Sequence, residues 1–182
     1  MPNTSVKVMF FSPARTAEYS TYFLSHSMNQ AVAYMSPPYC HTELRFPNSL
    51  SLSIVVGGNC RLMYREFDPE RYDAIQIFTT TEKLQKAIQL SQDVSNKKVK
   101  FGFTLEPSSN SSSTYCSKLV YDILAESTIY ADDLYTKSDY GIITPSNLAH
   151  NLLMKGHQKS SVFNSEPIAF SNMLNVDQPF SL

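Results

Sequence analysis

The sequence has no tryptophan and only five glycines, and its three cysteines are Cys40, Cys60 and Cys116. These cysteines form no C-x-x-C pair and are odd in number, which argues against a disulfide framework and against a zinc site. The histidines lie on scattered segments without the spacing of metal ligands, so we expect neither a metal nor a cofactor. Because reduced thiols are typical of cytosolic proteins, we expect a cytoplasmic location.

The sequence also has almost no net charge and no long apolar run. Fifteen Lys and Arg residues against sixteen Asp and Glu residues leave a net charge of −1, and no long basic run occurs. This balance argues against nucleic acid as a partner. No window approaches the roughly 18 uninterrupted apolar residues of a transmembrane segment, and residues 1–11 lack the pattern of a secretory signal. The sequence leaves the oligomeric state open.

The chain is long enough to bury one core, and 42% of its residues are hydrophobic. We expect a single domain over residues 1–156. Residues 157–182 are rich in Ser, Asn and Pro, and we expect an irregular C-terminal tail there.

Hydrophobic periodicity predicts an α+β fold. Apolar runs and alternating patterns predict short strands over residues 6–11, 40–46, 50–56, 61–67 and 72–78. Helical spacing of apolar residues predicts helices over residues 16–35, 80–96, 116–124 and 145–152. The last four strands follow one another closely, which predicts an antiparallel meander. We therefore expect a sheet of about four to six strands, with the helix that begins at Cys116 packed on it.

Capping signals mark where three of these helices begin. Thr79 opens a Thr-x-x-Glu capping box, and Ser113 or Thr114 can cap the helix of Cys116. The pair Thr144-Pro145 supplies an N-cap and a first-turn proline for the last helix.

Cys116 is the strongest candidate for chemistry. Apolar residues at Leu119, Val120, Ile123 and Leu124 define one stripe of its helix, which places Cys116 in the first turn on the inward face. Free amide groups and the positive end of the helix dipole favour a thiolate at that position. The alternative is that Cys116 is a small, buried and inert hydrophobic residue.

A cysteine hydrolase also needs a base, a group that orients the base, and N–H donors for the oxyanion. His41, at the start of a predicted strand, is the candidate base. Glu43 lies two positions on, on the same face, and is the candidate orienting group, with Ser51 or Ser53 of the next strand as alternatives. The backbone around residues 115–117 is the candidate oxyanion hole. In the alternative without catalysis, His41 lies at a solvated strand edge and Glu43 pairs with a neighbouring arginine.

Three segments together suggest a family. His41-Thr42-Glu43-Leu44-Arg45-Phe46, Thr114-Tyr115-Cys116-Ser117-Lys118-Leu119-Val120 and Ile143-Thr144-Pro145-Ser146-Asn147-Leu148, in this order, resemble the circularly permuted NlpC/P60 (papain-like) thiol hydrolases. In that branch the histidine strand precedes the cysteine helix, as it does here, and virus-encoded members of the poxvirus type belong to it. The chain departs from the pattern at Lys118, where an acidic residue often follows.

The resemblance implies a papain-like fold and a cysteine-dependent amidase, peptidase, acyl-ester hydrolase or acyltransferase. It implies Cys116 as nucleophile, His41 as base and Glu43 as the third polar residue, with Tyr115 and Ser117 beside the oxyanion. The implied partner is a peptide, amide or acyl-ester substrate. A viral member would act in the host cytoplasm or reside in the virion.

Two alternatives to this assignment remain. Adenain-like cysteine peptidases also have a histidine, then an acid, then a cysteine at a helix start, and in that case Glu66 or Asp68 would be the acid. Those enzymes usually have a glutamine shortly before the cysteine and a glycine after it, whereas this chain has Asn110 and Ser117. The second alternative is a papain-like protein without activity that serves in a virion or binds a host protein.

Overall fold

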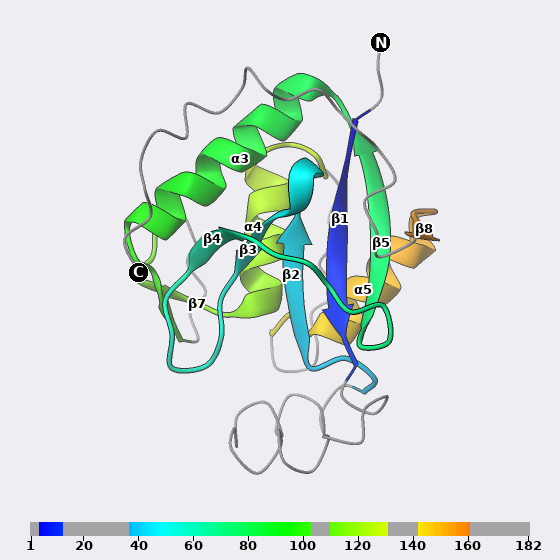
Figure 1. Cartoon of the computed structure of the whole chain (residues 1–182), viewed down its shortest axis with the longest axis horizontal. Coiled ribbons are helices and arrows are strands. Elements are labelled where there is room, and N and C mark those ends of the chain that lie inside the picture. Colours follow the sequence, from blue (N-terminus) through cyan, green and yellow to red (C-terminus); the bar gives the residue numbers. More distant parts are fainter. Residues whose placement is uncertain (1–3, 13–36, 103–109, 131–141, 161–182) are drawn as a thin grey trace.

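The structure is a computed structural model, and it describes residues 4–12, 37–102, 110–130 and 142–160 (Figure 1). The helix expected over residues 16–35 lies outside these ranges. The main sheet consists of β1 (Thr4–Phe11), β2 (His41–Arg45), β3 (Leu50–Ser53), β4 (Arg61–Tyr64), β5 (Tyr72–Thr79) and β8 (Gln158–Ser160). A parallel pair is formed by β6 (Lys100–Phe101) and β7 (Ser113–Thr114). The helices are α3 (Thr81–Asn96), α4 (Cys116–Glu126) and α5 (Pro145–Met154), with a short 3-10 turn, η2 (Pro47–Ser49).

The main sheet is antiparallel throughout and has six strands in the order β4-β3-β2-β1-β5-β8. The predicted α+β class and the predicted antiparallel sheet are therefore confirmed. The predicted meander holds for β2, β3 and β4 but is wrong for β5, because β1 lies between β2 and β5. Nearly every residue of β1 is buried, and a strand that is apolar on both faces belongs in the interior of a sheet.

Two of the three predicted helix starts need correction. Thr80, rather than Thr79, caps α3, and its hydroxyl accepts a hydrogen bond from the N–H of Lys83. Residues 113–114 pair with β6 as β7 and do not cap α4, whose N-cap is Tyr115 without a side-chain cap. The third prediction is confirmed, because Thr144 caps α5.

The end of the described chain also differs from the prediction. We expected irregular structure after residue 156, but β8 pairs antiparallel with β5 through residues 74–76. Three polar residues carry no apolar alternation, so the edge strand has no signature in the sequence. Residues 161–182 lie outside the described ranges.

Apolar side chains lie on both faces of the sheet. Along β1, Val6, Val8 and Phe10 belong to a large core that also contains the apolar stripe of α4. Met9 and Phe11 alternate with them and belong to a second cluster on the opposite face, together with Cys40, Phe67, Tyr72 and Ala74. In Figure 1, α4 lies beside β2, and contacts between these two elements bring the start of the helix to the start of the strand. None of the helices in the described ranges is long and apolar enough to cross a membrane.

Replacing Ile123, which is fully buried on the stripe of α4, tests the packing of this helix on the sheet. We expect Ile123→Ala to lower the free energy of unfolding by about 2–5 kcal/mol, because it removes buried methyl groups and leaves a cavity. The matched control is Met154→Ala on α5, whose residue is 73% exposed and which should change stability little. Urea denaturation followed by circular dichroism measures both. Equal effects of the two substitutions would contradict the assigned packing.

Candidate active site

The fold joins two residues that are distant in the sequence. Cys116 is the first residue of α4, and His41 is the first residue of β2. Their side chains lie close enough to interact electrostatically, and each residue is only 8% exposed. The start of a helix thus presents a sulfur to an imidazole at the end of a buried strand.

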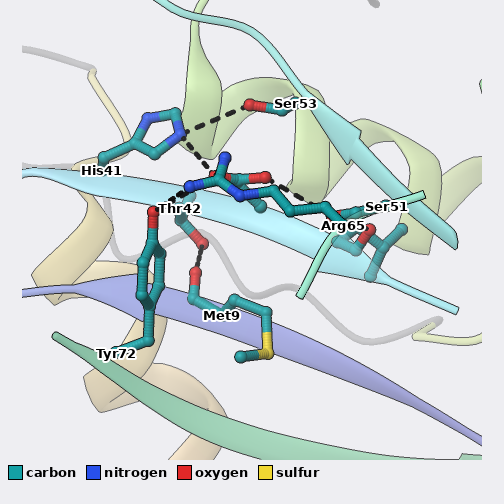
Figure 2. A network of polar contacts seen from close by, with 9 residues as sticks. Met9, His41, Thr42, Ser51, Ser53, Arg65 and Tyr72 are labelled. Carbon is teal, nitrogen blue, oxygen red and sulfur yellow. Dashed lines mark hydrogen bonds and ion pairs between the residues drawn. The ribbon is translucent and has the colours of Figure 1, made fainter. Parts of the chain in front are cut away.

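The Nε2 atom of His41 is directed towards two oxygens. It lies 3.3 Å from Oε1 of Glu43 and 3.5 Å from the hydroxyl of Ser53 on β3 (Figure 2). With Nε2 committed to these oxygens, Nδ1 is the ring nitrogen left for the thiol of Cys116. One nitrogen for the nucleophile and one for an orienting oxygen is the arrangement that a catalytic histidine requires.

The electrostatics favour an ion pair between these two groups. Burial by itself would lower the pKa of His41, but its hydrogen bonds to Cys116 and Glu43 and their negative charges raise the pKa from 6.5 to about 10. Burial would raise the pKa of Cys116, but the hydrogen bond to His41 and the imidazolium charge lower it below the ordinary thiol value. Backbone hydrogen bonds from Thr42 and Ser117 act in the same direction. Both shifts favour a thiolate beside an imidazolium over the neutral pair.

Glu43 is fully buried, and its carboxylate is densely bonded. Besides His41, it receives hydrogen bonds from Nη1 of Arg65 at 2.6 Å and from the hydroxyls of Ser51 and Tyr72, each at 3.4 Å. Burial would raise the pKa of the carboxyl, but the hydrogen bond from His41 and the charges of His41 and Arg65 hold it below its ordinary value. Glu43 is thus an anion that fixes the orientation of the imidazole.

The oxygens offered as alternatives lie in different places. The Ser53 hydroxyl, like Glu43, contacts the His41 imidazole. The Ser51 hydroxyl instead donates a hydrogen bond to the Glu43 carboxylate. Arg45, the expected partner of Glu43 in the alternative without catalysis, bonds Glu66 at 3.1 Å instead.

The acids of the adenain-like alternative are engaged elsewhere. Glu66 is bound to Arg45 and to Ser49, and its side chain is 77% exposed. Asp68 is 3.3 Å from Nε of Arg71 and accepts the N–H of residue 70 at 2.9 Å. The structure brings neither acid to His41.

Tyr115 and Ser117, expected beside the oxyanion, use their side chains for another purpose. The hydroxyl of Ser117 donates to the carbonyl of Ile143 at 2.6 Å, and the hydroxyl of Tyr115 accepts the N–H of Ile143 at 3.2 Å. These two bonds tie the start of α4 to the segment that leads into α5. These two side chains are therefore occupied, and the backbone N–H groups in the first turn of α4 are the donors that an oxyanion could use.

The other two cysteines are poor nucleophiles. Burial raises the pKa of both Cys40 and Cys60 to about 12, and for Cys40 the neighbouring charge of Cys116 adds to the effect. Within the described ranges, no group of three or more His, Cys, Asp or Glu side chains is arranged to hold a metal ion.

Sequence reasoning missed three contributors to the site: Arg65, Tyr72 and the backbone of Thr42. Arg65 follows β4 and Tyr72 opens β5, so neither belongs to the strand or helix that carries the candidate residues. An arginine among fifteen basic residues gives no signal by itself, and only the strand pairing reveals that it faces Glu43.

Thiol alkylation as a function of pH tests the ion pair. We expect the rate at which iodoacetamide modifies Cys116 to rise with pH around a lower midpoint than that of a free thiol, because His41 lowers the pKa of the Cys116 thiol. In His41→Ala the imidazolium is absent, so burial is no longer opposed by its charge and raises the pKa of the Cys116 thiol. Modification at pH 7 should then fall by about tenfold or more.

Cys40 and Cys60 are internal controls, since they should react only when urea unfolds the chain. Peptide mass spectrometry assigns each adduct. A Cys116 rate that rises through about pH 8.5 like that of a free thiol, with no effect of His41→Ala, would refute the ion pair.

The chain matches no protein-family model, no curated protein and no solved structure. Its function therefore has to be argued from the geometry of this site. That geometry comprises a buried Cys116–His41 pair with an ionised Glu43 behind it.

Proposed function

We propose that this protein is a cysteine-dependent hydrolase with a papain-like catalytic arrangement. The observation that carries the proposal is the approach of the Cys116 and His41 side chains, with Glu43 and Ser53 at Nε2 of the imidazole. A nucleophile, a base bonded to it and a third group that orients the base are the signature of covalent acyl chemistry. The order of the two elements, histidine strand before cysteine helix, supports the permuted NlpC/P60 branch.

The first half of the reaction transfers an acyl group to the sulfur. The Cys116 thiolate attacks the carbonyl carbon of an amide or ester, and the carbonyl electron pair moves to its oxygen. N–H groups in the first turn of α4 and the helix dipole stabilise that oxyanion. The intermediate then collapses, the C–N or C–O bond breaks, and the His41 imidazolium donates its proton to the leaving group. The products are a thioester on Cys116 and a neutral His41.

The second half restores the enzyme. Neutral His41 takes a proton from water as the water oxygen attacks the thioester carbonyl, and the C–S bond then breaks. A carboxylic acid leaves, and the thiolate–imidazolium pair forms again. An alcohol or amine in place of water gives acyl transfer by the same steps, so the residues support hydrolysis and transfer equally.

Trapping the acyl-enzyme tests the proposal without knowledge of the natural substrate. We expect p-nitrophenyl acetate to add one acetyl group to Cys116, seen by intact-mass and peptide mass spectrometry, and the adduct to decay on standing. Cys116→Ala removes the adduct. His41→Ala should slow formation of the adduct by about 10²–10⁴-fold, which is the usual contribution of a positioned general base to a reaction rate.

Two further variants compare the candidate acids. Glu43→Gln should slow acetylation, whereas Asp68→Asn, the matched control, should leave the rate unchanged because Asp68 is bound to Arg71 at the surface. A stronger effect of Asp68→Asn would favour the adenain-like assignment. Absence of any adduct on Cys116 in the wild type would refute the enzyme and leave a binding protein with the same fold.

A further inference from the structure

Arg65 binds the buried carboxylate of Glu43 through one nitrogen and the neighbouring Tyr72 hydroxyl through another. Nη1 of Arg65 lies 2.6 Å from Oε1 of Glu43, and Nη2 donates to the hydroxyl of Tyr72 at 2.8 Å (Figure 2). The Tyr72 hydroxyl in turn lies 3.4 Å from the same Oε1. The guanidinium therefore reaches one carboxylate oxygen directly and a second time through the tyrosine.

Other contacts hold the guanidinium in place. It lies over the rings of Phe67 and Tyr72, 5.0 Å and 5.6 Å from their centroids, and the backbone N–H of Arg65 donates to the carbonyl of Ser49 at 2.9 Å. The Arg65 side chain is 36% exposed, while that of Glu43 is fully buried. Arg65 thus supplies a positive charge from the surface to an anion in the interior.

The catalytic cycle makes this charge necessary. In the resting state, the imidazolium of His41 compensates the Glu43 carboxylate. In the acyl-enzyme the sulfur is uncharged, and His41 has to be neutral before it can accept a proton from water. Among the described residues that contact the carboxylate, Arg65 is then the one remaining cation. A buried carboxylate without a counter-charge is costly, so this step depends on Arg65.

We propose that Arg65 is a positioning residue that acts through Glu43 and sets how readily His41 gives up its proton. The inference rests on the proposed function, since it describes the second half of the same reaction. Without Arg65, deprotonation of His41 leaves Glu43 uncompensated. The His41–Glu43 pair therefore keeps its proton to higher pH, and hydrolysis of the acyl-enzyme slows near neutral pH.

The groups that face the pair come from each element packed against it. From α4 the Cys116 sulfur faces His41, and β3 contributes only the hydroxyls of Ser51 and Ser53. From β5 the hydroxyl of Tyr72 faces Glu43. On β2 itself, Arg45 lies two residues beyond Glu43 and is bound to Glu66, which matches its charge. From β1, which pairs with β2, the buried Lys7 lies in register with Arg45. The charges that change or compensate during the reaction are thus those of Cys116, His41, Glu43 and Arg65.

The test is the NMR titration of the His41 ring in a Cys116→Ala background, which reproduces the loss of the thiolate charge. Adding Arg65→Gln should raise the titration midpoint of His41 by on the order of one pH unit, the usual effect of one nearby charge. Arg65→Lys should restore most of the wild-type midpoint. The control Arg71→Gln removes a surface arginine paired with Asp68 and should leave the midpoint unchanged. A His41→Gln spectrum assigns the resonance.

A midpoint that stays the same or falls in Arg65→Gln overturns the proposal. If that variant fails to fold, Tyr72→Phe serves instead, since it keeps the ring under the guanidinium and removes only the hydroxyl. It should raise the midpoint by a smaller amount, and no change there likewise overturns the proposal. Neither measurement needs a nucleophile, so both judge Arg65 even if no acetyl adduct forms on Cys116 and the hydrolase fails.

Where the adduct does form, its decay gives a second readout. In Arg65→Gln with Cys116 intact, the pH profile for loss of the acetyl group should move upward by the same amount as the His41 midpoint. A purely structural defect would lower the rate at every pH without moving the profile, and that result counts against the proposal.

Discussion

The interaction on which the site depends is that between the side chains of Cys116 and His41. Two opposite charges at 8% exposure are stable only when further polar groups satisfy them, because each has lost most of its water. The surroundings supply these groups: backbone hydrogen bonds from Thr42 and Ser117 on the sulfur, and Glu43 and Ser53 on the imidazole. The need to compensate buried charge therefore explains why so many polar residues converge at one end of β2.

The fold meets this need by placing β2 between two elements that are distant in sequence. On one side, β2 pairs with β1. It also contacts α4, and this packing brings the start of the helix to His41. The hydrogen bonds of Tyr115 and Ser117 to Ile143 then anchor the same helix start to the segment before α5. A first turn held on both sides keeps its N–H groups fixed, and fixed donors are what oxyanion stabilisation requires.

The sequence predicts those parts of the site that depend on local pattern. The apolar stripe after Cys116 predicts its helix, and alternation around His41 predicts a strand with Glu43 on the same face. Local pattern does not predict which residues of different strands come into contact. Arg65 and Tyr72 meet Glu43 only because β5 crosses past the meander to pair with β1, and the alternation of β2 through β5 does not reveal that crossing. The polar strand β8 is missed for a similar reason, since only its partner identifies it.

The charges of the site alternate in sign along a row: the Cys116 thiolate, the His41 imidazolium, the Glu43 carboxylate and the Arg65 guanidinium. Lys118 and Asp122, bonded at 2.6 Å on one helix, form a pair of opposite charges. In the proposed reaction a row of four differs, because removal of the first charge by acylation leaves three charges and forces a rearrangement. The proton on His41 is the member that can leave, and its departure leaves a balanced pair of Glu43 and Arg65. Because the charges alternate in sign and are even in number, loss of the first two leaves a neutral pair. No buried ion is then left without a counter-charge.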